Sequence, residues 1–225
     1  MGVENNLIKI RKNISNDVTL VAVSKTKPIE DIKVAYDLGQ RDFGENKVQE
    51  LIEKEESLPK DIRWHFIGNL QTNKVKYLVN KVFIIHSLSS IKLLKKIEEE
   101  FSKQNSIANL LIQINIGKEE TKGGIFEEDL LEMINEVENC SHCKVKGIMA
   151  IIPKGNDEQN RFYFKKMKSI FDDLSKKSYK NIKMEILSMG MTHDYKIALE
   201  EGSNLIRVGE GIFGKRNIAG GLTNG

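Results

Sequence analysis

Lys25 is the residue of this chain whose position suggests chemistry. The apolar run 20–23 predicts a short buried strand, and Lys25 follows Ser24 at its carboxyl end. Pro28 ends the extended segment and opens a helix that we expect to reach Leu38. Lysine is seldom buried, so a lysine at the end of an inward-facing strand is either solvated or placed to use its amine, for example to form an imine.

Two glycine-rich segments, 188–192 and 209–214, have the composition of a phosphate site. Glycine lets backbone N–H groups approach phosphate oxygens closely, and Thr192 adds a hydroxyl donor. The second segment also spells G-x-G-x-x-G, but the dinucleotide fingerprint needs an acidic residue about 20 positions later. Only eleven residues follow Gly214. We therefore reject a dinucleotide and keep the phosphate.

A reactive amine and a phosphate cradle on one face predict a phosphorylated aldehyde held as a Schiff base. Lysine forms imines readily only as the neutral amine, so the site must desolvate Lys25 or place a cation beside it. Lys27 and Arg207 are the candidates for that cation.

Eight apolar segments alternate with helical patterns, which predicts a parallel sheet covered by helices. The expected strands are residues 20–24, 42–46, 63–67, 81–86, 108–116, 144–151, 184–187 and 204–208. The expected helices are residues 3–15, 28–38, 47–56, a turn running into a helix up to 79, 90–103 (capped by Ser89), 127–138, 161–176 and 195–201. Eight such units fit a (β/α)8 TIM barrel with an extra N-terminal helix, and the alternative is a doubly wound open sheet.

In a barrel the polar residues at the carboxyl ends of the strands would converge on one face. Besides Lys25, the two glycine-rich segments and Arg207, they are Asn46, Gln71, Asn73, His86, Ser87 and Asn115.

The composition fits one domain over residues 1–225, with a flexible tail from Asn217. The formal charge of +3, from 35 basic and 32 acidic residues, does not suggest a nucleic-acid partner. No apolar run is long enough to span a membrane, so we expect a cytoplasmic protein, and a monomer.

The pair Cys140 and Cys143 has no second ligand pair at the spacing of a zinc site, and it lies at the opposite end of the strands. We interpret it as two reduced thiols near a surface turn and expect no metal.

Five sequence blocks resemble the pyridoxal phosphate homeostasis proteins, a family related to the N-terminal barrel of alanine racemase. They are residues 21–25 (VAVSK), 43–50 (FGENKVQE), 64–74 (WHFIGNLQTNK), 187–192 (LSMGMT) and 206–214 (IRVGEGIFG). The blocks occur in order and span nearly the whole chain.

The resemblance implies pyridoxal 5'-phosphate (PLP) as the cofactor, held on Lys25 as an internal aldimine. It implies that Arg207 faces the pyridine nitrogen and that Asn46 lies beside the cofactor. Thr192 and the backbone at Gly209 and Glu210 would hold the phosphate, and Met189 completes the cofactor-binding set.

This chain departs from the common pattern of the family at two positions. Thr192 stands where many members carry Ser and keeps the hydroxyl, and Glu210 stands where many carry Thr or Ser. A carboxylate repels a phosphate unless it points away, so only the backbone of Glu210 is expected to contribute.

The resemblance also implies a role in vitamin B6 homeostasis and cofactor delivery, with PLP-dependent apo-enzymes as candidate recipients. An arginine at the pyridine nitrogen leaves that nitrogen unprotonated and weakens the electron sink. Racemases of the related family tolerate this arginine but need a second acid or base on the far side of the substrate, so we expect no catalytic residues and little or no turnover. The main alternative is a racemase-like PLP enzyme that uses His86 or Tyr195 as its second base. A phosphosugar aldolase with an imine on Lys25 is a third hypothesis.

Overall fold

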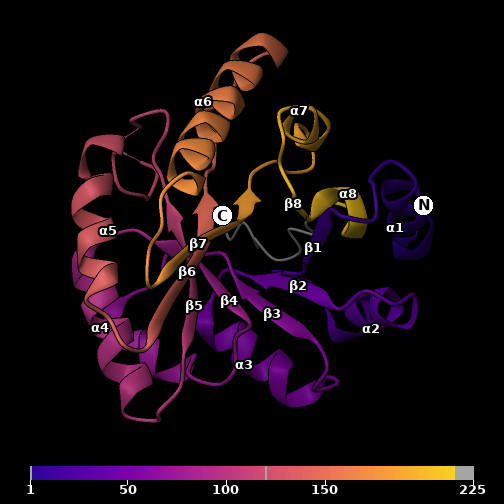
Figure 1. Cartoon of the computed structure of the whole chain (residues 1–225). Coiled ribbons are helices and arrows are strands. Elements are labelled where there is room, and N and C mark those ends of the chain that lie inside the picture. The colour runs from indigo at the N-terminus through magenta and orange to yellow at the C-terminus, as the bar shows by residue number, and fades with distance from the viewer. Residues whose placement is uncertain (1, 120, 216–225) are drawn as a thin grey trace, which may run out of the picture.

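Eight short strands pair side by side in parallel and close into a barrel, with β8 returning to β1 (Figure 1). The computed structural model describes residues 2–119 and 121–215. The strands are β1 (Thr19–Val23), β2 (Asp42–Glu45), β3 (Arg63–Phe66), β4 (Ile84–Leu88), β5 (Ala108–Gln113), β6 (Cys143–Met149), β7 (Ile182–Ser188) and β8 (Leu205–Val208). The predicted barrel is confirmed, and pairing of Ala22 with Val208 excludes the open sheet.

Helices surround the barrel and connect successive strands (Figure 1). They are α1 (Val3–Arg11), α2 (Ile29–Asp37), α3 (Val48–Ser57), η1 (Thr72–Tyr77), α4 (Ile91–Ser102), η2 (Glu127–Asp129), α5 (Leu130–Glu138), α6 (Asp157–Ser175), α7 (Tyr195–Glu200) and α8 (Glu210–Phe213). The expected extra helix is α1, which packs against α2 and α8. The Asn6 side chain donates a hydrogen bond to the carbonyl oxygen of Ile212 at 3.0 Å and so joins α1 to α8.

The fourth strand begins at Ile84 and not at the expected residue 81. Asn80 has a left-handed backbone with φ of 60°, which turns the chain before the strand. Phe83 follows that turn, is largely exposed and stacks at an angle on His65. His86 and Ser87 therefore lie within β4 instead of after it.

Several helix boundaries also differ from the prediction. Helix α6 begins four residues earlier, because Asn156 and Gln159 form a capping box. Helix α4 is capped by Ser90, whose hydroxyl accepts from the N–H of Leu93 at 3.1 Å, and not by Ser89. The segment after β3 forms only a 3-10 helix, and α1 ends before residue 15. The tail predicted from Asn217 lies outside the described residues.

Apolar residues fill the space between barrel and helices, whereas the barrel interior is mixed. Ile84, Leu111 and Met149 form a small apolar cluster of their own. Gly147 in β6 permits close strand packing there, since a Cβ atom at this position would lie 1.8 Å from the carbonyl oxygen of Ile186. Buried polar side chains occupy much of the remaining interior.

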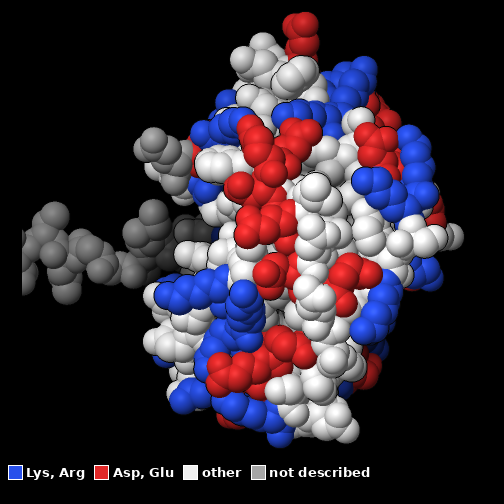
Figure 2. Space-filling view, turned by 60° about the vertical axis from the view of Figure 1, so that its left-hand side comes forward, with Lys and Arg blue, Asp and Glu red and all other residues white. Residues whose placement is uncertain are grey.

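The surface over α4 and α5 carries charges of both signs. Figure 2 shows acidic side chains beside basic ones on this face, and Lys96 and Lys103 pair with Glu99 and Glu100 along α4. Within residues 2–119 and 121–215, no helix has the length and apolar content needed to cross a membrane.

Candidate functional site

A cavity of about 580 Å³ opens at the carboxyl ends of the strands. Six residues of the expected cofactor-binding set line it: Lys25, Asn46, Thr192, Arg207, Gly209 and Glu210. The seventh, Met189, is fully buried in the core and does not line the cavity. Gln71, Asn73, Ser87 and Asn115, expected on the same face, do not line it either.

The segment before Lys25 is held by a buried ion pair. Lys54 of α3 donates to the carbonyl oxygen of Ser24 and to the Glu45 carboxylate, both at 2.8 Å. The Ser24 hydroxyl donates to the same Glu45 oxygen at 2.6 Å. Glu45 and Lys54 are both buried, and burial raises the pKa of the Glu45 carboxyl above its ordinary value. The network fixes the end of β1, from which Lys25 enters the cavity.

The turn after Lys25 is tied to the same helix. Thr26 has a left-handed backbone with φ of 63°, and its N–H donates to the Glu50 carboxylate at 2.6 Å. Glu50 also accepts from Lys54 at 2.7 Å. The pair Glu50 and Lys54 is spaced i, i+4 on α3, so the sequence carried a signal for it that we did not use.

Lys27 lines the cavity next to the segment that follows α8. Its ammonium group donates to the carbonyl oxygens of Phe213, Gly214 and Lys215, each at 3.0 Å. These carbonyls lie at and just beyond the end of α8, where helix carbonyls lack partners within the helix. Lys27 therefore anchors the segment that follows β8.

Arg207 is 3% exposed and points into the barrel from β8. Its guanidinium donates to the carbonyl oxygens of Ser188 at 3.0 Å and Ala150 at 2.8 Å, and also to the Ser188 hydroxyl. Burial lowers the pKa of Arg207 to about 10, so the group stays a cation at neutral pH. Three acceptors thus hold a fixed positive charge at the floor of the cavity.

A chain of buried hydrogen-bonding groups continues from Arg207 through the barrel interior. The Nδ1 atom of His86 lies 3.2 Å from the Ser188 hydroxyl, and its Nε2 atom lies 2.9 Å from Nδ1 of His65. The Nε2 atom of His65 lies 3.0 Å from the Asp42 carboxylate. Burial lowers the pKa of both imidazoles. This series of hydrogen-bonded side chains contacts Arg207 through Ser188 on the side away from the cavity.

Neither sequence-derived candidate for a second base lines the cavity. His86 is fully buried within the interior chain, and Tyr195 borders a separate, smaller hollow beside α1. His193 lines the cavity instead, and the sequence analysis did not single it out.

The opposite side of the cavity combines a hydroxyl with closely packed backbone. The Thr192 hydroxyl oxygen accepts from the N–H of Gly211 at 3.2 Å, which leaves its own hydrogen to donate to a ligand. Gly209 lies against β1, since a Cβ atom there would be 3.2 Å from the carbonyl oxygen of Val23. Glu210 lines the cavity and is exposed, so its carboxylate can remain in water.

Comparison with known proteins identifies the family. The family model for the alanine racemase N-terminal domain matches residues 2–217. The pyridoxal phosphate homeostasis protein of Aquifex aeolicus is 43% identical over 203 residues, covering 89% of this chain and 88% of that protein. The protein of the same name from Haemophilus influenzae is 39% identical over 233 residues, covering 97% and 98%. The chain belongs to the pyridoxal phosphate homeostasis protein family.

Solved structures agree with this membership. PipY of Synechococcus elongatus, whose structure has PLP bound, is 31% identical with a TM-score of 0.85, over 94% of this chain and 100% of that one. An alanine racemase from Clostridium difficile is 16% identical with a TM-score of 0.74, over 94% of this chain and 56% of that one. The second likeness shows the shared barrel alone.

The residues of this cavity fit PLP, the ligand of the PipY structure. The cavity offers an amine, a buried cation and a hydroxyl beside glycine backbone, and these groups are chemically complementary to an aldehyde, a ring nitrogen and a phosphate. The side-chain oxygen of Asn46 is buried and finds no hydrogen-bond partner among the described residues, so it is left available to a ligand. Gly68 allows the backbone of Asn46 to approach closely, since a Cβ atom at position 68 would lie 2.1 Å from the carbonyl oxygen of Asn46.

Proposed function

We propose that this protein binds PLP as a Schiff base on Lys25 and acts in the storage and delivery of the cofactor, with little or no turnover. The observation that carries the proposal is the convergence of Lys25, Arg207 and Thr192 on one cavity. Family membership supports the homeostasis role, because the relatives carry that name.

The roles assigned to the cavity residues follow from their chemistry. Lys25 supplies the amine, and Arg207 supplies a donor that cannot accept a proton from the ring nitrogen. Thr192 and the backbone N–H groups at Gly209 and Glu210 would bind the phosphate, and Asn46 would contact the ring substituents. Met189 is buried in the core and is not among the residues that line the cavity, so we assign it no contact with the cofactor.

Weak turnover follows from the state of Arg207. A permanent cation facing the ring nitrogen would keep that nitrogen unprotonated and would weaken the electron sink that the cofactor supplies when bound. A racemase would also need a second acid or base at the substrate, and His193 is the imidazole that lines the cavity among the described residues. Racemisation of a common amino acid that is lost in His193→Gln would support the enzyme alternative instead.

Delivery is tested by cofactor transfer. Protein loaded with PLP and freed of excess cofactor is mixed with a PLP-dependent apo-enzyme, and recovery of that enzyme's activity is followed. We expect activation to track loss of the aldimine absorption band from wild-type protein. Lys25→Ala should transfer nothing under the same conditions, because it retains no cofactor. Direct delivery would be contradicted if the apo-enzyme were activated no faster than by the same concentration of free PLP and if the rate did not depend on the concentration of loaded protein.

A further inference from the structure

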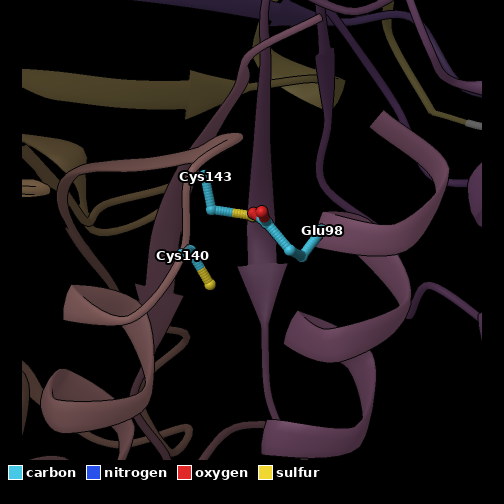
Figure 3. Close-up of side chains that lie close together, drawn as sticks. All are labelled: Glu98, Cys140 and Cys143. Carbon is cyan, nitrogen blue, oxygen red and sulfur yellow. The ribbon is translucent and has the colours of Figure 1, made fainter. Parts of the chain in front are cut away.

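Two cysteines and a glutamate meet at the amino ends of the strands, at the opposite end of the barrel from the cavity. Glu98 comes from α4, Cys140 follows α5, and Cys143 begins β6 (Figure 3). Two sulfur atoms and one carboxylate oxygen of this cluster all lie within 4.8 Å of one another. Figure 3 shows the side chains of Cys143 and Glu98 pointing toward each other from facing elements.

The glutamate is fixed in place by the turn between the cysteines. Its carboxylate accepts from the N–H of Ser141 at 2.9 Å and from the N–H of His142 at 2.9 Å. The Nδ1 atom of His142 lies 3.1 Å from the same carboxylate. These bonds orient the carboxylate toward the thiols, as outer-shell hydrogen bonds orient the carboxylate ligands of a metal.

Burial separates this cluster from an ordinary surface turn. Cys143 is 0% and Cys140 7% exposed although they flank a surface turn, whereas the Glu98 side chain is 26% exposed. Solvent therefore reaches the carboxylate side of the cluster but not the sulfur side. Solvent access on the glutamate side would let a water molecule complete the coordination of an ion held by the three ligand atoms.

The ligand set and its spacing suit zinc. Thiolate sulfur and carboxylate oxygen both bind Zn²⁺ in tetrahedral geometry, with bonds of about 2.3 and about 2.1 Å. Ligand atoms around such an ion lie about 3.4 to 3.8 Å apart. Side-chain movement of about 1 Å from the spacing observed here would reach that geometry.

We propose that Cys140, Cys143 and Glu98 form a zinc site, with a water molecule as the fourth ligand on the exposed side. Binding replaces the two thiol protons, which pass to solvent, so affinity rises with pH. His142 is a positioning residue that holds Glu98 from outside the ligand set. The bound ion would join α4 to the start of β6 and stabilise that end of the barrel. The sequence argument weighed the two cysteines alone, because Glu98 comes from a separate helix.

The test is an anaerobic titration of chelator-treated, reduced protein with Co²⁺, followed by displacement with Zn²⁺. We expect one Co²⁺ per chain, a sulfur-to-cobalt charge-transfer band and tetrahedral ligand-field bands, all removed by one equivalent of Zn²⁺. Zinc should also raise the melting temperature of the wild-type protein, because it binds the folded state.

Three variants locate the site. Cys140→Ser should lose the two-thiolate spectrum, and Glu98→Gln should bind at least about ten-fold more weakly. Gln keeps an acceptor for the turn, so Glu98→Gln should remain folded. Glu99→Gln removes the neighbouring carboxylate, which is exposed and paired with lysines, and should leave the titration unchanged.

Three outcomes would overturn the proposal. One is the absence of a thiolate band in the reduced wild-type protein. The second is a set of titrations that Cys140→Ser and Glu98→Gln leave unchanged while both proteins stay folded by circular dichroism. The third is a Cys140–Cys143 disulfide that forms in the purified protein and persists when zinc is present.

Discussion

Replacing Lys54 with methionine should destabilise the protein far more than replacing an exposed lysine. The ammonium group of Lys54 makes three hydrogen bonds of 2.7 to 2.8 Å, to Ser24, Glu45 and Glu50. The side chains of Lys54 and Glu45 are 6% and 0% exposed, so the variant leaves a buried carboxylate without its cation. Breaking a buried ion pair in this way costs about 3 to 5 kcal/mol of unfolding free energy.

The loss should depend on pH. Burial already raises the pKa of Glu45 above its ordinary value of 4.5, and removing the cation raises it further. A carboxyl group whose pKa is raised in the folded state does not lower the stability of the protein below its unfolded-state pKa. The protein loses stability as the pH rises from that value through the folded-state pKa. The deficit of Lys54→Met should therefore be small below about pH 4.5 and should grow toward neutral pH.

The measurement is urea unfolding of Lys54→Met, of Glu45→Gln/Lys54→Met and of a control, at neutral and acidic pH. The double variant removes the stranded charge and should recover about 1 to 3 kcal/mol. The control is Lys60→Met, whose side chain is 66% exposed and pairs with Glu55, and it should change stability by less than about 0.5 kcal/mol. Equal losses for Lys54→Met and Lys60→Met, or no recovery in the double variant, would refute the reasoning.

Three further predictions concern the cavity and its supports. Thr192→Val should weaken PLP binding about ten-fold while leaving the affinity for pyridoxal, which lacks the phosphate, unchanged in parallel titrations; equal weakening of both would remove Thr192 from the phosphate site. His65 and His86 both have pKa values lowered from 6.5, so the free energy of unfolding should fall as pH drops below about 6.5. In urea unfolding, His86→Gln should make this fall with pH shallower. An unchanged pH dependence would contradict the lowered pKa of His86. Gly68→Ala should lower the free energy of unfolding in urea by about 1 to 3 kcal/mol, because its Cβ atom would collide with the backbone of Asn46. An unchanged free energy of unfolding would contradict this close contact.

The fold was predictable from the sequence because its signals are local. Continuous apolar runs alternate with helical periodicity along the chain, which predicts parallel strands covered by helices, and eight such units favour a closed barrel over an open sheet. The errors occurred where the pattern is ambiguous. The apolar run 82–85 predicted a strand from residue 81, but Asn80 has a left-handed backbone, Phe83 is exposed, and β4 begins at Ile84.

The candidate site was predictable only in part. Strand-end position and family motifs pointed to Lys25, Thr192 and Arg207, and the structure brings these residues to one cavity. The supports of that cavity join distant segments: Lys54 reaches Ser24 across 30 positions, and His86 reaches Ser188 across 102. No local pattern encodes such contacts, and the same reason hid Glu98 from the analysis of the cysteines.

The central claim is that Lys25 carries PLP, and borohydride reduction of the loaded protein tests it most directly. Reduction fixes an imine as a stable pyridoxyl-lysine, which peptide mass spectrometry assigns to a residue. We predict a single major adduct on Lys25. Lys25→Ala should show neither this adduct nor the aldimine band. An adduct on Lys27, whose amine is held by hydrogen bonds at this cavity, or a scatter over surface lysines would contradict the account.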